Sequence, residues 1–364
     1  MSNKSKIAII DLTYNSGKYL QDVMDGIAAQ TYGKENLTVL LIPNNSPDDV
    51  VAFTDREIIP QSGEGKKYPE VVHYNDGVNH GFSGGNNVGI RWAMERGYEY
   101  VFLNNGDLKL EDPRCLERLI EEMENDEKVF SAQPLVAYWK QPELVNVAGG
   151  IFHVAGYAYA GHNLTPVSQI DTETVREVTY ASGAALLMRT SILEEIGLME
   201  DRFFMYHEDL ELGLRAMVAG YKNLLVPDVT ALHDYKFSKN KMMFAWIELY
   251  RWVVMIGYWK LPTLLLLAPL LAVIEVGTFL LAIKGGWIRA KLYSYSQLLR
   301  PKTWLLTRSI RKRTKRLRTI SDAKLFEHAS GKIEAQEQSS WIVERVGNPI
   351  IVAYRNSVAK LIRW

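Results

Sequence analysis

Short apolar segments alternate with amphipathic segments through roughly the first 235 residues, and this alternation constrains the fold more than any other feature. The apolar segments predict buried strands at Ile7–Leu12, Leu37–Ile42, Val71–Tyr74, Tyr100–Leu103, Val129–Ala132 and Ala184–Met188. The segments between them have helical periodicity, at Lys18–Gln30, Gly85–Arg96, Pro113–Met123 and Ser191–Ile196. Strands that alternate with helices predict an α/β domain with a mostly parallel sheet, in which ligands bind at the carboxyl ends of the strands.

The chain length and its single cysteine limit the class of protein. At 364 residues the chain is long enough for about two domains. Cys115 is the sole cysteine, so an intrachain disulfide is excluded and a reducing compartment is expected. The apolar run near the N-terminus is too short for a secretion signal. We therefore expect a protein that is not secreted.

Polar loops follow four of the predicted strands. The first two, at residues 13–16 and 43–48, have ordinary turn composition. The third, Asn79 to Gly89, is rich in glycine, so its backbone could approach a ligand while the following helix directs its N–H groups at a phosphate. It has neither the P-loop nor the dinucleotide-binding spacing, and a flexible turn is the alternative interpretation. The fourth, residues 104–107, could hold Mg²⁺ or Mn²⁺, although Asn-Gly-Asp is also common in turns.

A cluster of carboxylates begins a predicted helix later in the chain. Glu208, Asp209 and Glu211 follow an apolar run, and apolar residues at helical spacing continue until Gly220. Acidic residues at a helix start can serve only as caps that complement the helix dipole. Three carboxylates within four residues, however, raise one another's pKa, and this suits one of them for general-base chemistry.

The four loops and the carboxylate cluster, in this order, resemble the family 2 inverting glycosyltransferases, which have a GT-A nucleotide-sugar-binding fold. The resemblance extends from Ile7 to about residue 238. Asp11-Leu12-Thr13-Tyr14-Asn15 resembles the family's first-strand motif, which implies that Thr13, Tyr14 and Asn15 contact the nucleotide. The stretch from Asn79 to Gly89 resembles a motif common among rhamnosyltransferase-like members. That motif adds these expected donor-binding residues: Asn79, Gly81, Gly85 and Asn86.

The resemblance also implies the catalytic and metal-binding residues. Asn105-Gly106-Asp107 stands in place of the Asp-x-Asp motif, with Asp107 as the metal ligand and Asn105 beside the nucleotide sugar. Glu208-Asp209 matches the Glu-Asp motif, which implies that Asp209 is the catalytic base. Glu208, a further catalytic candidate, and Glu211 could tune Asp209 or bind the acceptor. His233 resembles a late histidine that helps to hold the metal or the diphosphate. The cofactor implied is Mg²⁺ or Mn²⁺.

Two positions depart from the family pattern. Pro43, followed by Asn44, stands where the family usually has an aspartate that reads the nucleotide base. Asn44 is retained as a predicted nucleotide-sugar contact, but the choice between dTDP- and UDP-linked donors stays open. Asn105 replaces the first aspartate of the metal motif, so Asp107 carries most of its charge.

The last third of the chain has a different character. Aromatic residues gather between 244 and 259, and residues 261–283 form a 23-residue apolar segment that contains Pro262, Pro269 and Glu275. Its length suits a membrane span, a broken helix in the inner leaflet, or a buried helical hairpin of a soluble protein. Of the 42 basic residues, twelve lie between Val276 and Ser321, where no acidic residue occurs. We expect residues 244–318 to attach to an anionic membrane surface on its cytoplasmic side, and we do not expect a nucleic-acid partner.

These features predict three regions. Residues 1–240 form a GT-A domain with a nucleotide-sugar half at about 1–125 and an acceptor half at about 126–240. Residues 241–320 form a helical membrane-association region, and residues 321–364 form an amphipathic helical tail. The predicted function is metal-dependent transfer of a sugar, rhamnose from dTDP-rhamnose or otherwise a UDP-linked sugar, to a glycan or polyprenyl-linked acceptor. The alternatives are a nucleotidyltransferase, which the absence of Lys and Arg from residues 79–89 disfavours, and a non-catalytic membrane-bound scaffold that binds nucleotide sugar or glycan.

Overall fold

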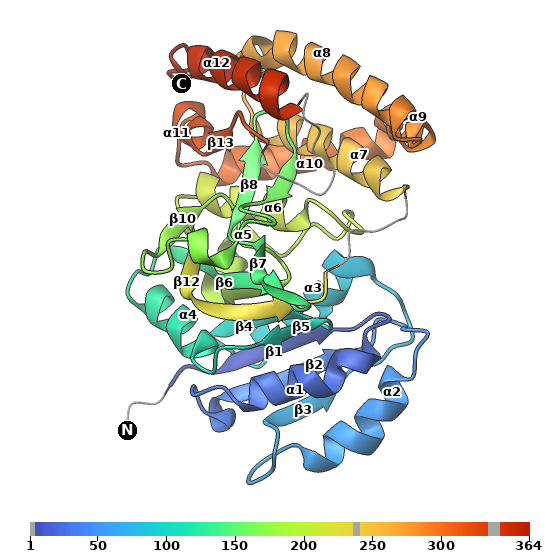
Figure 1. Cartoon of the computed structure of the whole chain (residues 1–364), viewed down its shortest axis with the longest axis vertical. Coiled ribbons are helices and arrows are strands. Elements are labelled where there is room, and N and C mark those ends of the chain that lie inside the picture. Colours follow the sequence, from blue (N-terminus) through green and yellow to red (C-terminus); the bar gives the residue numbers. More distant parts are fainter. Residues whose placement is uncertain (1–3, 236–240, 334–342) are drawn as a thin grey trace.

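The computed structural model describes residues 4–235, 241–333 and 343–364, and a mixed sheet forms its centre (Figure 1). The strand order is β3-β2-β1-β4-β11-β6-β12-β10, with β5 paired to β12 and β7 to β6. These strands are β1 (Ile7–Leu12), β2 (Leu37–Ile42), β3 (Glu70–His73), β4 (Tyr100–Asn105), β5 (Leu108–Leu110), β6 (Val129–Tyr138), β7 (Gln141–Val147), β10 (Arg176–Val178), β11 (Ala185–Arg189) and β12 (Lys222–His233). The principal helices of this part are α1 (Leu20–Ala28), α3 (Gly81–Met94), α4 (Cys115–Glu124), α5 (Thr190–Ile196) and α6 (Glu208–Val218). A short helix α2 (Val50–Phe53) follows β2.

The first half of the sheet is parallel, as the strand and helix alternation predicts. β1 pairs in parallel with β2 and β4, and Leu12 lies opposite both Ile42 and Asn105. The loops after these three strands therefore meet at one edge of the sheet. Each predicted strand and helix has a counterpart in the structure, so the predicted α/β fold class is confirmed.

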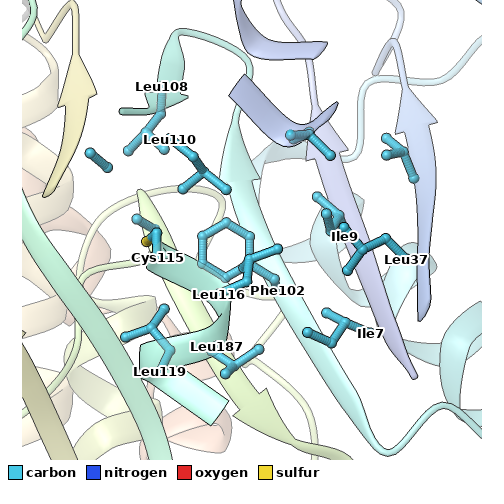
Figure 2. Close-up of a cluster of buried hydrophobic side chains, with 14 of the residues drawn as sticks. Ile7, Ile9, Leu37, Phe102, Leu108, Leu110, Cys115, Leu116, Leu119 and Leu187 are labelled. Atoms are coloured by element: carbon cyan, nitrogen blue, oxygen red, sulfur yellow. The ribbon is translucent and has the colours of Figure 1, made fainter. Parts of the chain in front are cut away.

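Buried apolar side chains on both faces of the sheet explain why its strands are almost continuously hydrophobic. On one face, Phe102 of β4 packs in one cluster with Ile9 of β1 and Leu116 of α4 (Figure 2). On the other face, Ile10 of β1 packs in a second cluster with Ile90 of α3. Burying one such side chain contributes about 1.5–3 kcal/mol to folding.

The second half of the sheet contains strands that the sequence pattern did not predict. The longest is β12, which pairs with β6 in parallel and shifts register between Val226 and Thr230. Pro227 and Asp228 lie within that shift and interrupt the apolar pattern by which a strand is identified. β12 carries His233 to the same edge of the sheet as the loops of the first half, through its pairing with β5.

The C-terminal third is helical and packs directly onto the sheet domain. Its helices are α7 (Met243–Tyr258), α8 (Leu261–Lys284), α9 (Ile288–Leu298), α10 (Pro301–Leu317), α11 (Asp322–Glu327) and α12 (Asn348–Ala359). A small sheet of β13 (Ala329–Ser330), β8 (Gly150–His153) and β9 (Ala158–Ala160) joins the two parts. One apolar cluster contains Phe203 and Leu210 together with side chains of α7, α8, α10 and α11. The helices thus extend the core of the sheet domain, and the predicted boundary near residue 240 adjoins residues 236–240, which lie outside the described part.

Helix α8 is long and apolar enough to cross a membrane by length and composition, with only 17% of its most apolar window buried. Helix α8 is therefore not buried, as the helical-hairpin interpretation requires. Glu275 interrupts the apolar sequence of α8, and its carboxylate forms ion pairs with Arg251 of α7 and Lys291 of α9. In Figure 1, α8 lies beside α12, and the hydroxyl of Tyr354 donates to the carbonyl of Leu266 at 2.7 Å.

The twelve basic residues predicted to form one attachment surface do not all face solvent. Four of them make internal contacts: Lys291, Arg311, Arg313 and Arg318. The other eight are exposed, namely Lys284, Arg289, Arg300, Lys302, Arg308, Lys312, Lys315 and Arg316. The amphipathic spacing of α10 (Pro301–Leu317) places some of its cations on its buried side. There they form ion pairs with acidic side chains or donate hydrogen bonds to backbone carbonyls.

Candidate active site

A cavity of about 740 Å³ lies between the sheet domain and the C-terminal helices. Four of the predicted site residues line it: Asn105, Glu208, Asp209 and His233. Its opposite wall is apolar and comes from α7, α8 and α12. The structure therefore brings the predicted catalytic residues to a space large enough for a substrate.

Asp209 is held at the start of α6 by backbone donors. The Gly183 N–H donates to Asp209 Oδ2 at 3.3 Å, and the Leu210 N–H donates to Oδ1 at 2.8 Å. The two residues that precede α6, Tyr206 and His207, both have left-handed backbone angles, with φ of 70° and 66°. Non-glycine residues adopt this conformation at a cost of about 1–3 kcal/mol each, and such strain clusters at functional sites. The turn directs Asp209 into the cavity while the helix continues away from it.

The three neighbouring carboxylates occupy different environments. Burial raises the pKa of Asp209, although its backbone hydrogen bonds act against the shift. Burial, followed by the adjacent Asp209 charge, raises the pKa of Glu208 further, and Glu208 Oε2 has no hydrogen-bond partner among the described residues. This pair favours a protonated Glu208 beside an ionised Asp209.

Glu211 lies on the far side of α6 and belongs to the core. Its carboxylate forms ion pairs with Arg215 and with Arg313 of α10, and it accepts a hydrogen bond from the Tyr258 hydroxyl at 2.7 Å. Burial would raise the pKa of Glu211, but the two arginines outweigh it and lower the pKa to about 2. The suggestion that Glu211 tunes the base or binds acceptor is therefore wrong, because its oxygens are occupied inside the fold.

Asp107 and His233 lie together, as the resemblance implies. His233 Nε2 lies 3.2 Å from Asp107 Oδ1, and His233 Nδ1 lies 3.0 Å from Asn146 Oδ1. When Nδ1 donates to Asn146, the neutral ring presents its Nε2 lone pair toward Asp107. The two side chains can then act as a pair of metal ligands. No group of three or more His, Cys, Asp or Glu side chains in the described ranges is arranged to hold a metal.

The loop after β1 packs against the metal motif. A Cβ at Gly106 would lie 2.4 Å from Ser16 Oγ and 2.9 Å from Thr13 Cγ2, so glycine permits this close approach. Thr13 is buried, and its hydroxyl donates to the Ile42 carbonyl at 3.3 Å. Tyr14 and Asn15 are exposed beside it. The first and fourth loops thus form one continuous surface next to Asp107.

Asp11 lies beneath this surface and is fully buried. Its Oδ1 has no hydrogen-bond partner within the described ranges, whereas Oδ2 accepts from Asn104 Nδ2 at 3.3 Å. Burial raises the pKa of Asp11 to about 7, against the effect of the Asn104 hydrogen bond. Polar residues at the end of a buried strand are the sequence signal by which Asp11 could have been included among the site residues.

The glycine-rich stretch has a different structure from the one expected. Helix α3 begins at Gly81 rather than Gly85, so Gly85 and Asn86 are helical and buried. A Cβ at Gly85 would lie 2.6 Å from Leu12 Cδ1, and Asn86 Nδ2 donates to the Phe82 carbonyl at 3.0 Å. These residues permit close packing of α3 on β1.

The first N–H groups of α3 are also occupied by protein. The Gly81 N–H donates to Asn79 Oδ1 at 2.9 Å, and the Phe82 N–H donates to the Phe204 carbonyl at 2.9 Å. Asn44 accepts from the His80 N–H at 2.8 Å and donates to the Gly81 carbonyl at 3.3 Å. Helix α3 therefore begins four residues earlier than predicted, and the Phe82 hydrogen bond links this stretch to the turn before Asp209.

Two positioning residues were missed by sequence reasoning. Asn146 orients His233, and Gly183 supplies a backbone donor to Asp209. Neither belongs to a recognisable motif, and each meets its partner only through the folded sheet.

Comparisons with known proteins agree with this geometry. Residues 9–197 match the model of "Glycosyl transferase family 2", and residues 110–307 match that of "Glycosyl transferase family group 2". The low-salt glycan biosynthesis hexosyltransferase Agl10 of Haloferax volcanii is 29% identical over 176 residues, which cover 47% of this chain and 54% of that relative. The chain thus matches only about half of that relative's length.

A second relative and a solved structure extend the comparison. The N-acetylglucosaminyl-diphospho-decaprenol L-rhamnosyltransferase of Mycobacterium tuberculosis is 24% identical, over 65% of this chain and 78% of its own. The mannosyltransferase PcManGT of Pyrobaculum calidifontis, solved with GDP-Man and Mn²⁺, has a TM-score of 0.51 and 14% identity over 87% of this chain and 86% of its own. The structural likeness supports the GT-A fold. The chain belongs to glycosyl transferase family 2 and is similar to its rhamnosyltransferase members.

Proposed function

We propose that this protein is an inverting, metal-dependent glycosyltransferase that moves a sugar from a nucleoside diphosphate sugar to an acceptor hydroxyl. The observation that carries the proposal is Asp209, a carboxylate with a raised pKa that lines the cavity and is fixed by backbone N–H groups. A general base must lie where the acceptor binds and must be ionised at the working pH. Asp209 lines the cavity, and Glu208, whose pKa is raised further by burial and by the adjacent Asp209, is the member of the pair that favours the proton.

The proposed reaction is a single displacement at the anomeric carbon. Asp209 accepts the proton of the acceptor hydroxyl while its oxygen forms a bond to that carbon. The bond from the carbon to the diphosphate oxygen breaks, and its electron pair leaves with the nucleoside diphosphate. Attack and departure occur on opposite faces of the sugar, so the anomeric configuration inverts.

Asp107 and His233 are the residues proposed to hold Mg²⁺ or Mn²⁺. Two protein ligands fit these ions, which commonly retain waters and complete their coordination with substrate phosphates. The bound ion would neutralise the charge that develops on the departing diphosphate. The presence of Mn²⁺ with GDP-Man in PcManGT supports a divalent ion in this fold.

The proposed donor is a nucleotide sugar bound along the loops after β1 and β4, by Thr13, Tyr14, Asn15 and Asn105. Rhamnose from dTDP-rhamnose is the first candidate, and a UDP-linked sugar is the second. The rhamnosyltransferase among the relatives supports this order. The loop after β2 and the start of α3 are proposed to contribute the other nucleotide-sugar-binding residues: Asn44, Asn79, Gly81, Gly85 and Asn86.

The proposed location is the cytoplasmic face of a membrane, where the enzyme would act on a glycan or polyprenyl-linked acceptor. The exposed apolar residues of α8 and the exposed cations around α9 (Ile288–Leu298) support such attachment. The name of the mycobacterial relative, which acts on a decaprenol-linked substrate, also supports it.

The test is nucleoside diphosphate release by the detergent-solubilised protein with dTDP-, UDP- and GDP-sugars and either metal. Release from one donor, dependent on metal and lost in Asp107→Ala and Asp209→Asn, is expected. Binding of each donor is measured in parallel by calorimetry. A protein that neither binds nor cleaves any donor would contradict the proposal and favour the non-catalytic scaffold.

A further inference from the structure

The cavity at Asp209 continues along α8, far beyond the space that a sugar needs. The residues of α8 that line it are Leu270, Val273, Ile274, Gly277, Thr278 and Leu281. Their spacing of three and four residues defines a single stripe along the helix. One face of α8 therefore forms a wall of the cavity over three turns.

The wall opposite this stripe is also apolar. Ile350 and Ile351 of α12 line the cavity, together with Phe244 and Ile247 of α7. The catalytic side contributes Asp209, Ser182 and His233. The cavity thus has a polar part at the sheet domain and an apolar part between helices.

The apolar part reaches the surface of the molecule. Val273 is 69% exposed and Ile350 is 59% exposed, although both line the cavity. The adjacent outer face of α8 presents Leu265, Val276 and Leu280, each at least 60% exposed. Among the described residues, the exposed apolar face of α8 is therefore continuous with the apolar part of the cavity.

We propose that the space between α8 and α12 binds the hydrocarbon tail of a lipid-linked acceptor, with the acceptor hydroxyl at Asp209. This inference rests on the proposed glycosyl transfer and assigns a place in the fold to the tail of its polyprenyl-linked acceptor. The occupant is a polyprenyl phosphate-linked sugar, because a molecule with a polar head and a long apolar tail matches both parts of the cavity. A water-soluble glycan would leave the apolar walls without a partner.

Gly277 offers a direct way to test this assignment. Gly277 belongs to the cavity wall, and a Cβ added there has no atom within 4 Å, so a larger side chain at this position has room. Gly277→Trp should block the tail path without a clash. Val276→Trp is the matched control, because Val276 is the neighbouring residue on the outer face and is absent from the cavity wall.

The experiment uses the full chain in phospholipid nanodiscs and a polyprenyl phosphate that carries a diazirine near the end of its tail. After photolysis, mass spectrometry should locate labels on α8 and α12 side chains of the cavity. Labelling should fall at least tenfold in Gly277→Trp and remain unchanged in Val276→Trp. Ile350→Trp, an independent change on the opposite wall, should also reduce it, and thermal unfolding checks that each variant folds.

Two results would overturn the inference. One is equal labelling of the wild type and both cavity variants. The other is equal labelling of the cavity by a diazirine-bearing phosphatidylglycerol, which would indicate a site for bulk lipid. The assay requires no donor, so failure of glycosyl transfer would appear separately, as absence of donor binding and nucleoside diphosphate release.

Discussion

His233 Nε2 lies 3.2 Å from Asp107 Oδ1, although 126 residues separate these side chains in the sequence. The pairing of β12 with β5 creates this contact, because His233 lies opposite Leu108 in the antiparallel register. The Asp234 N–H then donates to the Asp107 carbonyl at 3.1 Å. The proposed metal site thus lies where the turn between β4 and β5 meets the end of β12.

Asp209→Asn should lower turnover by about 10²–10⁴-fold, because it removes the proposed base while preserving side-chain shape. Donor affinity, measured by calorimetry, should change little. Asp201→Asn is the control, since Asp201 is an exposed aspartate shortly before it in the chain. Turnover at the wild-type rate would exclude Asp209 as the base.

Asn146→Ala should weaken metal binding by about 10–100-fold, because His233 loses the hydrogen-bond partner of Nδ1 that orients its ring. The measurement is a Mn²⁺ titration in the presence of a nucleoside diphosphate. Asn125→Ala, an exposed change at the end of α4, serves for comparison. Equal Mn²⁺ affinity in both variants would show that Asn146 has no orienting role.

Glu211→Gln should destabilise the fold, because it leaves the buried Arg215 without its carboxylate partner. Loss of one partner of a buried pair typically costs about 3–5 kcal/mol. Chemical unfolding measures this cost, and the exposed Glu194→Gln should have no comparable effect.

The same residue predicts an acid dependence of stability. The pKa of Glu211 is about 2 in the folded protein and about 4.3 when unfolded, so its contribution is complete above the unfolded pKa. That contribution, about 3 kcal/mol, is lost as the pH falls from about 4.3 toward 2. The free energy of unfolding should therefore fall more steeply with acid in the wild type than in Glu211→Gln. If the free energy of unfolding of the two proteins fell in parallel with pH, Glu211 would not be the source of this acid dependence.

Charge reversal of exposed cations near α8 should weaken binding to anionic vesicles. Arg289→Glu and Lys302→Glu should each reduce the partition coefficient at least about fivefold, since a basic residue near such a surface contributes about 1 kcal/mol. Vesicle sedimentation at low and high salt measures the effect. Lys66→Glu, in the sheet domain, should bind as the wild type does. Unchanged binding of the first two variants would remove these cations from the attachment surface.

The sequence by itself determined the fold class and most of the proposed catalytic residues. Apolar strands such as β1 and amphipathic helices such as α4 are local patterns, because each is set by the spacing of apolar side chains. The motifs around Asp107 and Asp209 are also short and local, so the sequence shows them without the fold.

Only the tertiary structure decided what depends on contacts between distant segments. In the sequence, Glu211 and Asp209 are equivalent acidic residues at a helix start. In the folded helix α6, Glu211 points into the core and Asp209 lines the cavity. The glycines of α3 looked like a phosphate loop, yet their close approach is to Leu12 and Phe204. The apolar segment at α8 left three arrangements open, because composition does not show which face of a helix is covered. Packing against α7, α9 and α12 covers one side of α8, pairs Glu275 with cations and leaves the rest exposed beside the cavity, which rules out the buried arrangement.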